Sequence, residues 1–322
     1  MTQPLPSVAA PAPLPAFPHA TPTPYHLMLR TWTYAWWRPV VGMLLVLFGF
    51  LIAAPVAMLP VVAVAALFEK GPWTQNFSDT MTLKRVDAGA LLYLNLTLAS
   101  MILVTWLVMR VLHNMRPRWL ASVRPRLRWK FLFACLGLSV IALGASILVG
   151  SFLPGGSDEG GTGHLNHFTV ASMLVAVVVM LTTPLQAAGE EYAFRGYLMQ
   201  AIGSLSRSRW LAIVATATVF ALAHGVQNPP LFFDRFAFGF IAGWLVTYTG
   251  GLEAGIALHV LNNILAFGIA LAFGDLATTV KVEQVSWWNI VNTVTQSGVY
   301  TVLVVLVARK MGLRNTTAPP GS

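Results

Sequence analysis

Charge and cysteine are the scarcest features of this chain. Only 10% of its 322 residues are Asp, Glu, Lys or Arg, whereas 56% are hydrophobic. A soluble domain carries about 25% charged residues, so this composition excludes an ordinary soluble protein. The single cysteine, Cys135, lies in an apolar run, which excludes a disulfide framework and a cysteine metal cluster. We therefore predict an all-α, polytopic membrane protein.

Several familiar hydrolase motifs are absent as well. The sequence contains no H-E-x-x-H, the helical motif of many zinc peptidases, and no G-x-S-x-G, the turn that holds a serine nucleophile. Asp275 has no second membrane aspartate in a comparable motif, which disfavours an aspartyl dyad. Residues 1–27 lack an early basic residue and an apolar core. Their Pro- and Ala-rich composition predicts a disordered tail rather than a signal peptide.

Long apolar runs dominate what is present. A run of about 20 apolar residues can cross a bilayer as a helix, and the chain contains about eight of them. Pro55 and Pro60 predict a kink in the first run. The expected spans cover residues 40–67, 89–112, 131–153, 168–203, 209–225, 232–249, 254–274 and 287–308.

The spans divide the chain into four further parts besides the N-terminal tail. These are an N-terminal region of three spans with a basic loop (28–167), a core of spans four to seven (168–275), a last span (276–314) and a short tail (315–322). No internal repeat is evident, which weakens the interpretation as an inverted-repeat transporter.

Loop charge predicts the orientation of the chain. Basic residues gather in alternate loops and acidic residues in the others, so the positive-inside rule places both termini in the cytoplasm. The net charge of +9 fits membrane lipids with anionic headgroups as partners, and no nucleic acid. The Ala-, Arg-, Trp- and Pro-rich composition suggests a bacterial cytoplasmic (inner) membrane. The basic loop residues are Arg30, Arg38, Arg110, Arg116, Arg118, Arg124, Arg126, Arg128, Lys130, Arg207, Arg209, Arg309, Lys310 and Arg314.

Ionisable and polar residues inside the core spans are the most informative feature. An ionised group in hydrocarbon costs about 2.5–3.5 kcal/mol on insertion scales, so a chain that keeps such groups is expected to use them. Glu190 lies 17 residues before Arg207 and His224 lies 17 residues after it. In a helical hairpin that turns at Arg207, these equal offsets place Glu190 and His224 at the same depth.

Spacing along each helix suggests a division of roles. Glu191 and Arg195 are four residues apart in the favourable order for a helical ion pair, which leaves Glu190 freer to act as a base. His259 and Asn263 are also four apart and share a helix face, where they could stabilise an oxyanion. His224 could help Glu190 to position water or could bind a metal. Taken singly, each residue could equally be structural, as interhelical glue or as a buried ion pair.

At these residues the sequence resembles the CPBP intramembrane protease family, also called the Abi family. This family includes CAAX prenyl endopeptidases of the Ras-converting type and bacteriocin-processing or immunity proteins. The E-E-x-x-x-R motif matches Glu190, Glu191 and Arg195. The F-x-x-x-H motif matches Phe220 and His224, and the H-x-x-x-N motif matches His259 and Asn263. The resemblance covers residues 168–275.

The resemblance implies an intramembrane endopeptidase whose site lies within the bilayer and opens to the cytoplasm. Glu190 and His224 would activate water, and His259 and Asn263 would stabilise the oxyanion. Glu191, Arg195 and Phe220 would support the site. The family is often labelled metalloprotease, so zinc is possible, with His224 and His259 as candidate ligands. A metal-free mechanism is weakly favoured, because the two histidines lie on different helices and Asn is a poor zinc ligand.

Two other classes of function compete with a peptidase that cleaves a peptide or protein at the membrane. One is a non-catalytic immunity, binding or assembly protein of the same fold. The other is a proton-coupled transporter that uses Glu190 and the histidines as a relay. The concentration of polar residues in spans four to seven argues against the transporter, and the unpaired Glu190 favours catalysis over a scaffold.

Overall fold

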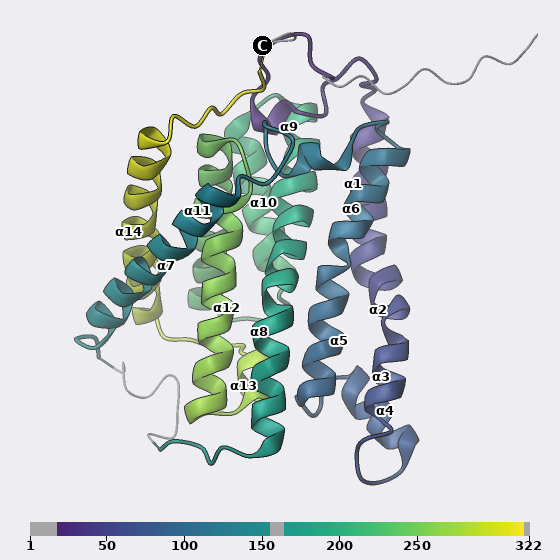
Figure 1. Cartoon of the computed structure of the whole chain (residues 1–322), viewed down its shortest axis with the longest axis vertical. Helices are drawn as coiled ribbons and strands as arrows, with labels where there is room; N and C mark the ends of the chain where they lie inside the picture. Colours follow the sequence, from purple (N-terminus) through teal and green to yellow (C-terminus); the bar gives the residue numbers. More distant parts are fainter. Residues whose placement is uncertain (1–17, 155–163, 319–322) are drawn as a thin grey trace, which may run out of the picture.

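The computed structural model describes residues 18–154 and 164–318, and every regular element in these ranges is a helix. Figure 1 shows an elongated helical bundle. Within the described ranges, seven helical stretches are long and apolar enough to cross a membrane, which confirms an all-α polytopic membrane protein. They are Trp37–Ala65, Ala88–Val111, Trp129–Gly150, Val170–Ser206, Pro229–Thr249, Glu253–Phe273 and Trp288–Lys310.

The remaining expected span, 209–225, is a shorter helix in the structure. Helix α10 covers Arg209–Leu222, and its 14 residues are about 21 Å long, less than the roughly 30 Å of a hydrocarbon core. It follows α9 through Arg207, which has a left-handed backbone (φ 60°), and through Ser208, which caps its first turn. Helix α10 then packs along α11 (Pro229–Thr249) as a hairpin.

The first span is interrupted, as its two prolines predict. It consists of α1 (Trp37–Phe48), a π-helical segment (Gly49–Ala53), α2 (Ala54–Ala57) and α3 (Leu59–Ala65). Each proline falls in the first turn of a short helix, the part of a helix that tolerates proline best. The short helix α4 (Trp73–Met81) leads to the second span, α5 (Ala88–Ala99) and α6 (Met101–Val111).

The fourth span is continuous past the Glu pair to the turn at Arg207, as expected. It begins with a capping box between Thr169 and Ser172 and comprises α8 (Val170–Glu191), a π-helical segment (Tyr192–Leu198) and α9 (Met199–Ser206). The π-helical turn starts directly after the two glutamates. Widened turns of this kind are frequent at functional sites.

The other spans surround α8 and α12. Helix α12 (Glu253–Phe273) packs against both α8 and α7 (Trp129–Gly150), while α5 covers another side of α8. The short helix α13 (Leu276–Val280) connects α12 to α14 (Trp288–Lys310), which packs on α7 and α11. Figure 1 shows α8 and α12 side by side in the middle of the bundle and α14 at its edge.

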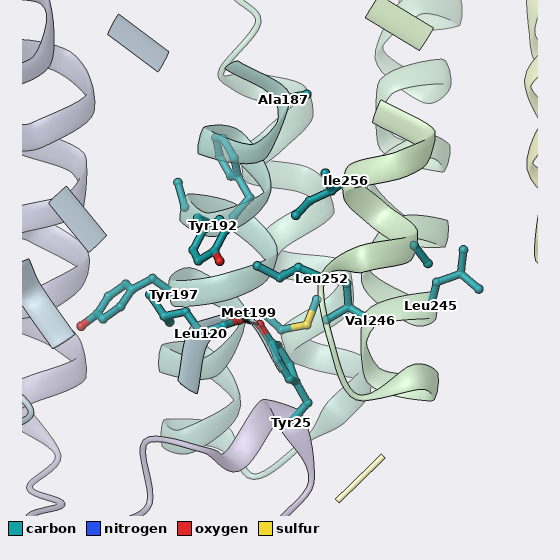
Figure 2. Packing of buried hydrophobic residues seen from close by; sticks show 14 of the residues in the cluster. Tyr25, Leu120, Ala187, Tyr192, Tyr197, Met199, Leu245, Val246, Leu252 and Ile256 are labelled. Atoms are coloured by element: carbon teal, nitrogen blue, oxygen red, sulfur yellow. Dashed lines mark hydrogen bonds between the residues drawn. The ribbon is translucent and has the colours of Figure 1, made fainter. Parts of the chain in front are cut away.

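The N-terminal tail is more ordered than expected. Residues 1–17 lie outside the described residues, but Tyr25 is fully buried in a short helix (Tyr25–Leu27) and donates a 2.5 Å hydrogen bond to the Leu120 carbonyl. Figure 2 shows Tyr25 beside Met199. The sequence shows an aromatic residue after a Pro-rich tract, but not that the fold buries its side chain against the Leu120 carbonyl.

The described C-terminal residues also differ from the expected free tail. Pro24 pairs with Thr316, and the Thr23 amide donates to the Thr317 hydroxyl at 2.9 Å. Residues 319–322 lie outside the described ranges. Both described ends of the chain therefore meet at one end of the bundle, at the top of Figure 1. The connection between α6 and α7 lies at the same end and includes the expected basic loop.

Candidate active site

Helices α8, α10 and α12 bring the three sequence motifs together. Packing of α8 on α12 places the Glu pair beside His259, and α10 packs on the π-helical segment after the Glu pair. Gly189, next to Glu190, allows α5 to approach α8, since a Cβ on this residue would collide with the Leu98 carbonyl. Close backbone packing of this kind holds the Glu pair in a fixed position between helices.

The ion pair expected between Glu191 and Arg195 is present. Arg195 Nη1 donates to Glu191 Oε1 at 2.8 Å, and both side chains are fully buried. The Arg195 guanidinium also lies 4.0 Å from the centre of the Phe220 ring, within the range of a cation–π contact. Phe220 thus contacts the buried cation directly, which gives the aromatic residue of the second motif a supporting place in the site.

His259 bridges the two carboxylates. Its Nε2 lies 3.2 Å from Glu190 Oε2, and its Nδ1 lies 3.0 Å from Glu191 Oε1. The ring is buried, and a ring with protons on both nitrogens donates to both glutamates. From the sequence we expected His259 to act with Asn263, but its shortest polar contacts are with the Glu pair.

Asn263 reaches the site through a residue that we did not single out from the sequence. Asn263 Nδ2 donates to Gln186 Oε1 at 2.8 Å, and Gln186 Nε2 donates to Glu190 Oε1 at 3.0 Å. Gln186 is buried on α8, one helical turn before Glu190. A polar residue at that spacing, inside an apolar span, is the sequence signal that would have identified it.

His224 lies at the edge of this cluster. It follows the last turn of α10, is exposed, and its Nδ1 lies 2.8 Å from the Phe220 carbonyl. A carbonyl only accepts, so Nδ1 carries the proton and Nε2 is the acceptor of the neutral ring. Among the described residues, no hydrogen bond or ion pair joins His224 to Glu190. Their hydrogen bonds in the described structure go to other groups.

Several polar atoms of the cluster keep unused hydrogen-bonding capacity. Among the described residues, Glu191 Oε2 and two nitrogens of Arg195 are buried without a hydrogen-bond partner, and Glu190 Oε2 has only the 3.2 Å contact with His259 Nε2. Buried polar atoms normally have partners, and exceptions in a native structure call for an explanation. A carboxylate oxygen with one contact can accept further hydrogen bonds, so Glu190 Oε2 can receive water or a polar substrate group beside the imidazole.

The histidines do not converge as zinc ligands. Both nitrogens of His259 face carboxylate oxygens, which leaves Nε2 of His224 as the one imidazole acceptor of this cluster that faces no described protein group. Within the described ranges, no group of three or more His, Cys, Asp or Glu side chains has the arrangement of a metal site. The donor set therefore does not fit a zinc ion, which requires unprotonated nitrogen or carboxylate ligands around one point.

An apolar cavity of about 510 Å³ lies beside the cluster. It is bounded by the first span, including Phe50, by Met101 of α6, and by Phe194 and Ala223 near the motif residues. Polar atoms contribute little to its wall. An apolar side chain or a lipid-like group fits this lining better than a charged one.

Comparison with known proteins agrees with the motifs. Residues 169–265 match the family model described as type II CAAX prenyl endopeptidase Rce1-like, and this segment includes all three motifs. The match confirms the resemblance to the CPBP protease family. The chain is also similar to the uncharacterized protein YyaK of Bacillus subtilis (strain 168), with 27% identity over 99 residues.

The similarity to that relative is confined to part of both proteins. It covers 29% of this chain and 32% of YyaK, so the chain matches about a third of the length of this curated relative. No solved structure matches. The family model covers α8 to the middle of α12 and does not reach the first three spans or the last span.

Proposed function

We propose that this protein is an intramembrane endopeptidase of the CAAX-protease type, which hydrolyses a peptide bond near the cytoplasmic surface of a bacterial inner membrane. The observation that carries the proposal is the buried group of Glu190, Glu191 and His259, with His259 within 3.2 Å of both carboxylates. The family match at residues 169–265 supports peptidase chemistry for the same segment.

In the proposed reaction Glu190 is the general base. A water molecule at Glu190 Oε2 gives its proton to this oxygen and attacks the scissile carbonyl, and the proton then passes to the leaving amine. His224, whose Nε2 is an acceptor, helps to orient the water. Gln186 holds the other oxygen, Oε1, so that Oε2 keeps its direction.

Asn263 and His259 stabilise the oxyanion in this proposal. The Asn263 amide uses one N–H toward Gln186, and its second N–H is available for the substrate oxygen. His259 Nε2, which faces Glu190 in the described structure, donates to the oxyanion once Glu190 has taken a proton. Glu191 and Arg195 position His259 and do not take part in bond making.

The surroundings of the site suit a membrane-adjacent peptide. The apolar cavity between the first span and Phe194 would accept an apolar part of the substrate, while the peptide bond lies at the polar cluster. The basic end of the bundle, where both described chain ends meet, would face the cytoplasm by the positive-inside rule. The proposed division of the chain has its peptidase core at 168–275, inside a larger helical framework.

Proteolysis in reconstituted liposomes tests the proposal. The wild type is compared with Glu190→Gln and Asn263→Ala on a library of membrane-tethered peptides, with Asp79→Asn as a control at the far end of the bundle. We expect both site variants to lose cleavage and the control to keep it, with no effect of a chelator. Loss of cleavage on chelation, restored by zinc, would overturn the metal-free mechanism.

A non-catalytic immunity or assembly protein is the second candidate. The observation in its favour is the closed network around Arg195, in which Glu191 and His259 tie α8 to α12 as a scaffold would. Absence of cleavage by the wild type on the whole library, together with capture of a partner that Glu190→Gln still binds, would favour this role.

A further inference from the structure

A second cavity, of about 540 Å³, lies at the basic end of the bundle. Its walls are the loop after the short helix Pro117–Leu120 and the segment that follows α14. The α11–α12 turn adjoins it, since a Cβ on Gly250 would lie 2.8 Å from the Arg314 carbonyl. The cavity is distinct from the candidate active site and shares no lining residue with the cavity at Phe194.

Three arginines line this cavity, and two of them have no acidic partner. Arg128 is paired with Glu253, with Nη2 and Oε2 2.6 Å apart. Arg124 and Arg314 are exposed, and no carboxylate of the described residues forms an ion pair with either side chain. The cavity therefore carries two uncompensated guanidinium groups. Guanidinium matches the geometry of a phosphate group through two parallel hydrogen bonds.

The same cavity also has an apolar part. Trp119, Val123 and Leu313 belong to its lining, and most of its wall is apolar. Its lining includes Arg128, directly before α7, and Met311, directly after α14, and these two packed spans have apolar, exposed outer faces. Trp129, the first residue of α7, is 60% exposed at this level, which is typical of an aromatic side chain at the membrane interface.

We propose that this cavity binds an anionic phospholipid of the adjacent leaflet. Arg124 and Arg314 contact the phosphate of the headgroup, and the apolar lining receives the glycerol and the first carbons of the acyl chains, which continue along α7 and α14. Basic pockets at the ends of spans are known to select anionic lipids on electrostatic grounds. The proposal does not depend on the peptidase activity.

Arg128 connects the proposed lipid site to the start of α12. It lines the cavity, and its Nη1 donates to the Thr249 carbonyl at 2.7 Å while it pairs with Glu253, the first residue of α12. Helix α12 carries His259 and Asn263. A bound lipid that fills the cavity therefore stabilises the end of the helix that carries half of the candidate site, and we expect the thermal midpoint to rise with lipid occupancy.

Native mass spectrometry of the purified full-length protein tests the proposal. The protein is titrated with phosphatidylglycerol, and with phosphatidylcholine of the same chain length as the neutral comparison. The variant Arg124→Gln/Arg314→Gln removes the two cavity charges, and Arg116→Gln/Arg118→Gln removes the same number of charges from the α6–α7 connection outside the cavity lining. We expect about 30-fold weaker phosphatidylglycerol binding in the first variant and less than 3-fold in the second, from two lost contacts of the usual size.

The remaining outcomes are decisive as well. A phosphatidylglycerol-dependent rise in the thermal midpoint that the first variant loses and the second keeps would support the proposal. Equal loss in both variants would show general surface attraction and overturn it. Displacement of the lipid by millimolar inorganic phosphate would assign the site to a soluble phosphate compound. Equal affinity for phosphatidylcholine would show that the two arginines do not select an anionic headgroup, and it would overturn the proposal.

Discussion

Two Arg–Glu ion pairs, Arg128–Glu253 and Arg195–Glu191, lie against the first half of α12, at Glu253 and at His259, and they differ in how many hydrogen bonds they make. Arg128 pairs with Glu253 through Nε and Nη2, donates through Nη1 to the Thr249 carbonyl, and its backbone amide also donates to Glu253. Arg195 makes one hydrogen bond to Glu191, and its Nε and Nη2 have no hydrogen-bond partner among the described residues.

The residues around the two ion pairs also differ in their chemistry. The Arg128 pair fastens the basic loop to the start of α12, where Ser122 also pairs with Gly251. The Arg195 pair has His259 against its carboxylate and Glu190 beyond it. A buried pair with all its hydrogen bonds made is a structural connection, whereas one with spare polar atoms and further ionisable groups is able to take part in chemistry.

The largest loss of activity is expected from a substitution of Glu190, next to the Arg195–Glu191 pair. Glu190→Gln keeps the size of the side chain but removes the base, so we expect the proposed cleavage to fall about 1,000-fold, within the usual range for a general base. The thermal midpoint should stay close to wild type. Single-turnover assays on a cleaved peptide measure the rate, and a variant that retains more than a tenth of it would contradict the assignment.

The next largest effect is a loss of stability when the Arg128–Glu253 pair is broken. Glu253→Ala leaves Arg128 buried without its carboxylate, and breaking a buried pair in this way costs about 3–5 kcal/mol. We expect a lower midpoint in thermal unfolding followed by circular dichroism, but unchanged turnover per folded molecule. If turnover fell as far as in Glu190→Gln at a temperature where the variant is folded, the two pairs would not have separate roles.

Two glycines allow the pairs to be compared with the same substitution. A Cβ on Gly251 would lie 2.5 Å from Glu253 Oε2, and a Cβ on Gly255 would lie 2.6 Å from Glu191 Oε2. Overpacking costs about 1–3 kcal/mol in either place. We expect Gly251→Ala to lower only the thermal midpoint, and Gly255→Ala to lower kcat as well because it displaces Glu191 from His259. Equal kcat values for the two variants would argue against a role of Glu191 in positioning.

The smallest loss of activity is expected at Gln186, which connects Glu190 to Asn263. Gln186→Leu removes the contacts of Gln186 with Glu190 and Asn263 but leaves both of those residues in place. We expect about a 10-fold loss in kcat with little change in KM, the equivalent of roughly 1.4 kcal/mol for one lost hydrogen-bonded connection. Steady-state kinetics separate the two parameters. A change in KM alone would show that Gln186 acts on substrate binding.

The two ion pairs differ in whether the spacing of residues along the sequence predicts them. The Glu191–Arg195 pair was predictable because a helix places residues four apart on one face, whatever surrounds it. The Arg128–Glu253 pair joins residues 125 positions apart, and no local pattern connects them. The expected partnership of Glu190 with His224 followed from equal depth in a hairpin, but equal depth does not fix the direction of a side chain.

The membrane class, most of the spans, the interruption at the prolines and the three motifs could be predicted from the chain's residues, because apolar run length and helical periodicity are properties of neighbouring residues. Three contacts needed the packed structure: His259 bridges both glutamates, Gln186 connects Asn263 to Glu190, and Tyr25 donates to the Leu120 carbonyl. These contacts depend on how helices distant in sequence pack and rotate against one another, which no single helix encodes.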